Sequence, residues 1–99
     1  MIMVDVIQSN ESRAIEISKY LIEKKYALHT HIDTNKIIAD KTEMSTVRLF
    51  FITKALLFDI IYNDVHEKFR QKDLLIYASP VSHIGKDYGE RLRLNLKAV

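Results

Sequence analysis

The sequence has no cysteine, no tryptophan, one proline and two glycines among its 99 residues. The absence of cysteine excludes a disulfide framework, a thiolate nucleophile, an iron–sulfur cluster and a cysteine-based zinc site. No apolar run approaches the roughly 20 residues that a transmembrane helix needs. The N-terminal stretch lacks the basic and apolar regions of a secretory signal. We therefore expect a cytoplasmic protein.

Charge is nearly balanced, because 15 basic residues against 13 acidic ones give a formal net charge of +2. Dedicated nucleic-acid-binding proteins gather their basic residues more heavily. Here Arg91, Arg93 and Lys97 stand without interleaved aromatic residues, which is typical of a solubilising surface. We expect neither a nucleic-acid partner nor a membrane partner. The length and the apolar share of 47% indicate one folded domain over residues 1–99.

The first half of the chain predicts a strand, a helix and a second strand. Residues 2–7 are nearly apolar on both faces, which is typical of a central strand. Ser9 or Asn10 can then cap a helix that extends to about Lys25, because apolar residues follow at helical spacing. From residue 27 the period becomes two and predicts a strand over residues 27–33, with residues 36–39 as a candidate continuation after a kink at Thr34 and Asn35.

The second half predicts another strand, helix and strand. Residues 40–43 are polar and turn-like, and residues 47–52 are the clearest strand in the chain. Thr53 is expected to cap a second helix, whose apolar stripe runs over residues 57–69. A fourth strand over residues 74–78 should end before Pro80, which cannot donate to a sheet ladder. Gly85 and Gly89 are expected to break the tail, in which residues 90–94 form a short helix or strand.

The order β-α-β-β-α-β predicts an α+β, ferredoxin-like fold, with two helices on one face of a four-stranded antiparallel sheet. Two helices can cover only one face of the sheet. The other face would expose apolar residues, either Met3, Ile7, Phe50 and Ile52 or the residues that alternate with them along the same strands. A small monomer rarely tolerates such a patch, so we expect assembly through the sheet.

These patterns resemble the CutA family of small divalent-cation tolerance proteins. The resemblance is a pattern over most of the chain and includes no catalytic signature. It implies a ferredoxin-like fold and a homotrimer in which the helix-free faces of the sheets turn toward the three-fold axis. The matching segments are the strand, polar cap and helix of residues 4–25, the strand entry Tyr-Ala-Leu at 26–28, Leu-Phe-Phe-Ile-Thr-Lys at 49–54, the helix of 57–61 with Val65, and Asp-Leu-Leu-Ile-Tyr-Ala-Ser-Pro-Val at 73–81.

The chain also departs from the family pattern. The His-Pro-Tyr-Glu-x-Pro motif of the family is replaced by residues 67–72, and its Tyr-x-Trp-x-Gly hairpin is missing from the shorter connection of residues 36–45. The usual Cys after the first helix gives way to the region of His29 and His31. The lost residues are those closest to a signature, so fold and trimer carry over better than a role for copper or another metal. A divergent CutA-like branch and a cousin among the nitrogen-regulatory PII proteins both fit.

The one cluster of metal-ligand type is His29-x-His31-x-Asp33. On a strand, residues two apart point to the same face, so both imidazoles and the carboxylate would project together. These are credible ligands for a divalent cation such as zinc or copper. The alternative is that they form the solvated side of a half-buried strand, with Leu28 and Ile32 facing inward.

Three classes of function remain open. The first is a CutA-like homotrimer that binds or responds to a divalent cation or a small ligand. The second is a PII-like signalling or structural interaction module without a metal. The third, a hydrolase or lyase on the same scaffold, is disfavoured because no nucleophile–base pair, phosphate loop or nucleotide fingerprint is present, and we expect no enzyme.

Overall fold

The computed structural model describes residues 1–70 and 73–99. Gln71 and Lys72, the end of the segment that replaces the proline motif, lie outside the described residues. The elements run in the order β1 (Ile2–Gln8), α1 (Glu11–Glu23), β2 (His31–Ala39), β3 (Thr42–Thr53), the short 3-10 helix η1 (Ala55–Leu57), α2 (Phe58–Phe69), β4 (Leu75–Pro80) and α3 (Lys86–Asn95).

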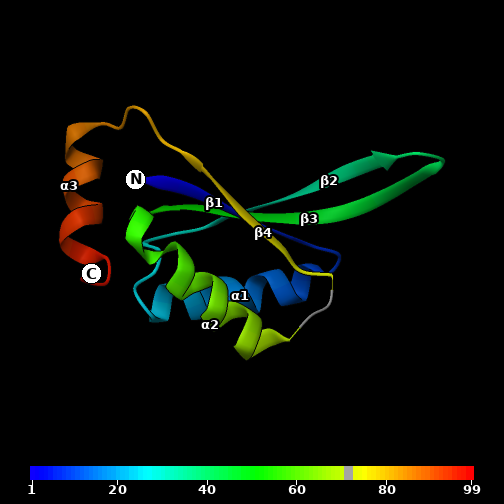
Figure 1. Ribbon diagram of the computed structural model, residues 1–99, viewed down its shortest axis with the longest axis horizontal. Helices are drawn as coiled ribbons and strands as arrows, with labels where there is room; N and C mark the ends of the chain where they lie inside the picture. The colour runs from blue at the N-terminus through cyan, green and yellow to red at the C-terminus, as the bar shows by residue number, and fades with distance from the viewer. Residues whose placement is uncertain (71–72) are drawn as a thin grey trace.

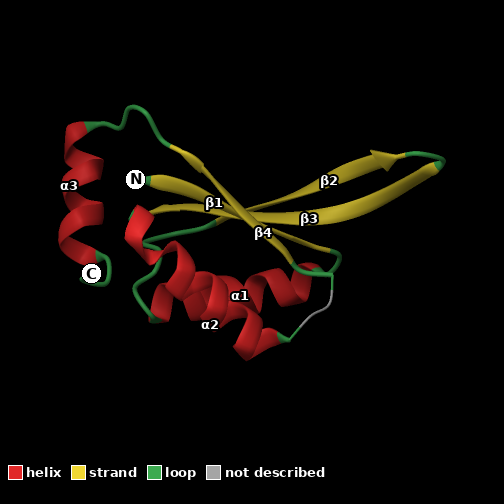
Figure 2. Cartoon of the chain, viewed as in Figure 1, coloured by secondary structure: helices red, strands yellow, loops and turns green. Residues whose placement is uncertain are grey.

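The strands form one antiparallel sheet in the order β2-β3-β1-β4. Helices α1 and α2 lie side by side below the sheet, and α3 stands across the end where β1 begins (Figure 1). Figure 2 shows the same two layers by element type, with the β2–β3 hairpin projecting beyond the helices. The α+β, ferredoxin-like architecture with a short C-terminal element is therefore confirmed.

Alternation along β1 and β3 divides the sheet into two faces. Val4, Val6, Leu49 and Phe51 are fully buried against the helices. Their partners from α1 and α2 recur at helical spacing, so each helix lays one apolar stripe on the sheet. The helix residues in this core are Ile17, Leu21, Ile61 and Val65.

The opposite face of the sheet carries no helix over most of its length, and we call it the open face. The register pairs Met3 with Ile52, and Asp5 with Phe50, on this face. Met3, Ile7, Phe50 and Ile52 all remain partly accessible there. The expected second apolar face is present, and it also contains the charged residues Asp5 and Arg48.

Strand β2 corrects the predicted boundaries. It begins at His31 and runs unbroken to Ala39, because Thr34 and Asn35 pair in register with Val47 and Thr46. The predicted kink is therefore wrong. Strand β3 likewise begins before the predicted strand, at Thr42, so the two strands form one long hairpin closed at residues 40–41.

Two further predictions from single residues are wrong. Thr53 is the last residue of β3 and caps no helix, because its Oγ1 donates a 2.7 Å hydrogen bond to the carbonyl of Tyr26 while α2 begins after η1. Gly89 lies inside α3 rather than breaking it. A Cβ at Gly89 would approach Cγ2 of Ile84 to 3.3 Å, so its small size serves a close contact.

Candidate functional site

The open face brings His31 and Asp33 together with residues from two other strands. Ile32 packs against the core, so its neighbours on β2 point to the other side. In the β2–β3 register His31 lies opposite Phe50, and Asp33 lies opposite Arg48. The predicted same-face placement holds for these two residues of the cluster.

His29 reaches the same cluster by a different route. It lies in the loop before β2 and therefore does not follow the strand alternation that predicted its position. Its ring packs edge-on against His31 at 5.1 Å between centroids, and its Nδ1 lies 3.4 Å from the hydroxyl of Tyr88 on α3. The ring of His31 is stacked on Phe50 at 4.9 Å. An aromatic row thus links α3 to the centre of the sheet.

Arg48 occupies the centre of the open face and bridges two carboxylates. Its Nη2 lies 3.3 Å from Asp5 and its Nη1 lies 3.5 Å from Asp33, while the guanidinium covers the Phe50 ring at 4.0 Å. Asp33 also accepts a 2.6 Å hydrogen bond from the side-chain amide of Asn35. Because Asp33 already has these two partners, a metal ion would have to compete with Arg48 for its carboxylate.

The described residues of one chain bring too few donors together for a metal centre. Within residues 1–70 and 73–99, no three histidine, cysteine or acidic side chains are grouped so that they could hold an ion. Zinc sites generally take three or four protein ligands, and one chain offers the two imidazoles of His29 and His31. The metal assignment of His29, His31 and Asp33 stays a prediction and needs ligands from further copies of the chain.

The sequence contained an unused signal for the rest of this cluster. Asp5 and Arg48 are the charged residues inside the two most apolar strands, and charges are almost never placed there unless paired. Their opposite signs could have suggested the pairing of β1 with β3. Tyr88 carried no comparable signal, because its contact with His29 spans 59 positions in the chain.

A second polar cluster joins the two core helices and is structural. The hydroxyl of Tyr26 donates a 2.6 Å hydrogen bond to Asp64 of α2. Burial, aided by the neighbouring Asp64 carboxylate, raises the pKa of Tyr20 to about 12 and also raises the pKa of Tyr26. Burial opposes ionisation of Asp64, but the hydrogen bonds from Tyr26 and Tyr20 outweigh it and lower the pKa of Asp64.

Solved structures share this fold over their full length. CutA1 from Pyrococcus horikoshii superposes with a TM-score of 0.86 at 17% identity, covering 99% of this chain and 100% of that one. The divalent cation tolerance protein of Thermus thermophilus gives 0.82 at 22% identity, covering 98% and 100%. The periplasmic divalent cation tolerance protein CutA of Archaeoglobus fulgidus gives a TM-score of 0.86 at 18% identity, covering 98% of this chain and 100% of that one.

These likenesses define the class of the fold. The chain has a ferredoxin-like α+β fold of the kind found in CutA1 proteins, with the same extent and without a large insertion on either side of the comparison. No family model and no curated protein matches the sequence. No helix within residues 1–70 or 73–99 is long and apolar enough to cross a membrane.

Proposed function

We propose that this chain is a divergent member of the CutA family and acts, as a single domain of residues 1–99, in a homotrimer that binds a divalent cation or a small ligand. The full-length likeness to three CutA proteins supports the family assignment. The observation that carries the assembly is the open face, where apolar residues surround the Asp5–Arg48 pair. Obligate interfaces are largely apolar in this way.

The unpaired sheet edges are consistent with the same assembly. Among the described residues, the outer edges of β2 and β4 have no partner strand, since the order is β2-β3-β1-β4. An exposed edge presents a row of free N–H and C=O groups that can pair with another chain. Tyr77 and Leu75 of β4 are about half exposed, so pairing with a second copy would bury apolar surface along with these edge groups.

The proposed ligand site is the cluster of His29 and His31, completed by other protomers. Each chain contributes two imidazoles placed edge to face on the side of the sheet where protomers would meet. Copies of the chain that approach a shared axis would supply further metal ligands. Asp33 would be one of them if its ion pair with Arg48 breaks. Zinc and copper are the expected ions, because imidazole is a preferred ligand for both.

The second candidate is a PII-like signalling or structural trimer without a metal. One observation favours it: Asp33 is held by Arg48 and Asn35, and His29 by the hydroxyl of Tyr88. In this case the cluster would serve only to fasten α3 and the sheet at the interface. Neither candidate assigns an enzymatic role. A cytoplasmic location is proposed for both, whereas the Archaeoglobus protein is described as periplasmic.

Calorimetric titration with Zn²⁺ and Cu²⁺ separates the two candidates. The metal-binding proposal requires saturable binding by the wild type that is lost in a His29→Ala/His31→Ala double variant. His83→Ala is the matched control, because His83 is exposed and lies outside the cluster. Identical weak heats for the wild type and the double variant would favour the trimer without a metal.

A further inference from the structure

A cavity of about 550 Å³ lies where the C-terminal ends of α1 and α3 meet, away from the open face. The segment after α3 is fastened there, because the backbone N–H of Lys97 donates a 2.8 Å hydrogen bond to the carbonyl of Lys25. The volume of the cavity falls in the range of small-molecule sites, which is about 300–1,000 Å³.

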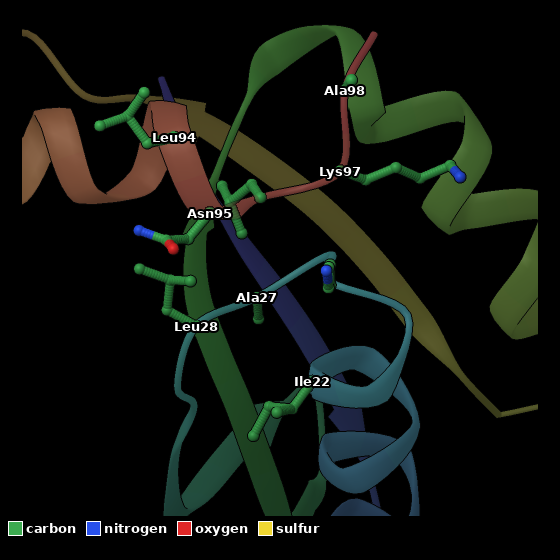
Figure 3. Close-up of a pocket in the computed structure, with 9 residues that line it drawn as sticks. Ile22, Ala27, Leu28, Leu94, Asn95, Lys97 and Ala98 are labelled. Atoms are coloured by element: carbon green, nitrogen blue, oxygen red, sulfur yellow. The ribbon is translucent and has the colours of Figure 1, made fainter.

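The cavity is lined by both apolar and polar groups, and none of its lining residues is acidic. Six of its nine lining residues are apolar, two are lysines and one is asparagine. Figure 3 shows Leu28 and Leu94 at one side of the space and Ile22 below it. Leu94 is 75% exposed, so a large apolar side chain of the cavity lining remains accessible to a ligand. These features suit an apolar ligand body.

Lys25 supplies the charge at the rim of this cavity. No acidic group of the described residues lies within ion-pair distance of it. Two carbonyls of the last turn of α1 are already taken, since Leu21 accepts from the backbone of Tyr26 and Ile22 accepts from that of Lys25. The ammonium group is therefore not needed by these two carbonyls.

The backbone at Lys25 gives an independent reason to look for a role of its side chain. Its φ is 61°, a left-handed conformation just past the end of α1. Glycine is the usual residue there because it has no Cβ to strain. A lysine at this position accepts backbone strain and places a cation in the lining of the cavity.

We propose that this cavity binds a single-chain anionic amphiphile, with its carboxylate on Lys25 and its tail against Leu28, Leu94 and Ile22. Lys97 extends its side chain away from the space in Figure 3, so Lys25 is the head-group contact. The concave wall favours one bound tail over a flat lipid surface. The site uses none of the open face and is independent of the proposed metal-binding or signalling function.

The test is calorimetric titration with dodecanoate below its micelle-forming concentration. Lys25→Gly and Leu94→Asn are each expected to weaken dodecanoate binding at least about tenfold, as the loss of a charge-assisted or well-packed contact does. Lys24→Gly and Leu56→Asn are the matched controls, because both residues are exposed and lie outside the cavity lining. Both controls should change the dissociation constant less than about twofold.

Stability measurements keep folding apart from binding. Lys25→Gly removes backbone strain, so its unfolding temperature should be no lower than that of the wild type, although its binding of dodecanoate is weakened. Equal binding of dodecyltrimethylammonium would overturn the charge argument, and equal losses in the control variants would overturn the location. Binding to phosphatidylglycerol vesicles that depends on Leu56 as much as on Leu94, without dodecanoate binding, would replace the cavity with a lipid surface.

Discussion

Arg48 and Asp5 form an ion pair, 3.3 Å from Nη2 to Oδ1, on the face of the sheet that α1 and α2 leave uncovered. Asp5 is only 7% exposed although it lies on this face, where the register places it between Phe50 of β3 and Tyr77 of β4. A charge pair at the centre of an apolar interface fixes how copies can dock, since an unpaired charge there is costly to bury. This pair therefore connects the fold of one chain to the assembly that we propose.

Breaking this pair should destabilise the chain measurably. Arg48→Ala leaves the Asp5 carboxylate buried without its cation, which we expect to lower the free energy of unfolding by about 1–3 kcal/mol. Denaturant unfolding followed by circular dichroism measures the loss. The double variant Asp5→Leu/Arg48→Leu should recover most of the stability lost in Arg48→Ala, because no buried charge then remains unpaired. A double variant as unstable as Arg48→Ala would refute the unpaired-charge explanation.

Phe50 and Phe51 are neighbours with opposite expected roles. Phe51 is buried against the helices, so Phe51→Ala should cost about 3–5 kcal/mol of unfolding free energy. Phe50→Ala should weaken assembly more than folding, because its ring lies on the open face. Unfolding and sedimentation measured on both variants test the assignment, and equal, small effects at both positions would contradict it.

The cluster of Tyr20, Tyr26 and Asp64 predicts a loss of stability in alkali. A tyrosine whose pKa is raised on folding contributes stability that is present below its unfolded pKa, near 10, and is lost as the pH rises through the folded value. For Tyr20 that folded value is about 12, so the unfolding free energy should fall between about pH 10 and 12. Thermal unfolding across this range measures the fall.

Asp64 predicts a second loss of stability, which occurs as the pH falls rather than as it rises. Its folded pKa is lowered, so its contribution is present above the unfolded carboxyl pKa and is lost as the pH falls through the folded value. Tyr26→Phe removes the 2.6 Å hydrogen bond and should cost about 1–3 kcal/mol near neutral pH. The same variant should flatten the acid limb, and an unchanged acid limb would show that Tyr26 does not hold Asp64 ionised.

A shared metal site would respond to pH in a characteristic way. Protons compete with a metal ion for imidazole nitrogen, so Zn²⁺ binding through His29 and His31 should weaken as the pH is lowered from about 7 to 5. Calorimetric titration at several pH values measures the change. Affinity that does not vary with pH would exclude these imidazoles as the ligands.

Much of the fold could be predicted because its signals are local. The cap at Asn10 follows from residue type and position, and its side chain accepts from the backbone of Arg13 as expected. Thr53 shows the limit of the same rule, because its hydroxyl is taken by the Tyr26 carbonyl 27 positions away. Local chemistry permits a cap at Thr53, and tertiary packing assigns the hydroxyl elsewhere.

The candidate site was less predictable because its contacts are long-range. Strand alternation correctly placed His31 and Asp33 on one face. It could not show that Asp33 faces Arg48, or that His29 meets Tyr88 from beyond the end of the strand. The cavity beside Lys25 likewise forms only after α3 packs at the end of α1.

The mass of the protein in solution tests the central claim most directly. One chain weighs 11.6 kDa, and a homotrimer sediments with three times that mass. We expect sedimentation equilibrium at micromolar concentration to give the trimer for the wild type. Ile52→Glu, which places a charge on the open face, should give a folded chain of lower mass. A wild-type mass of one chain under the same conditions would contradict the assembly.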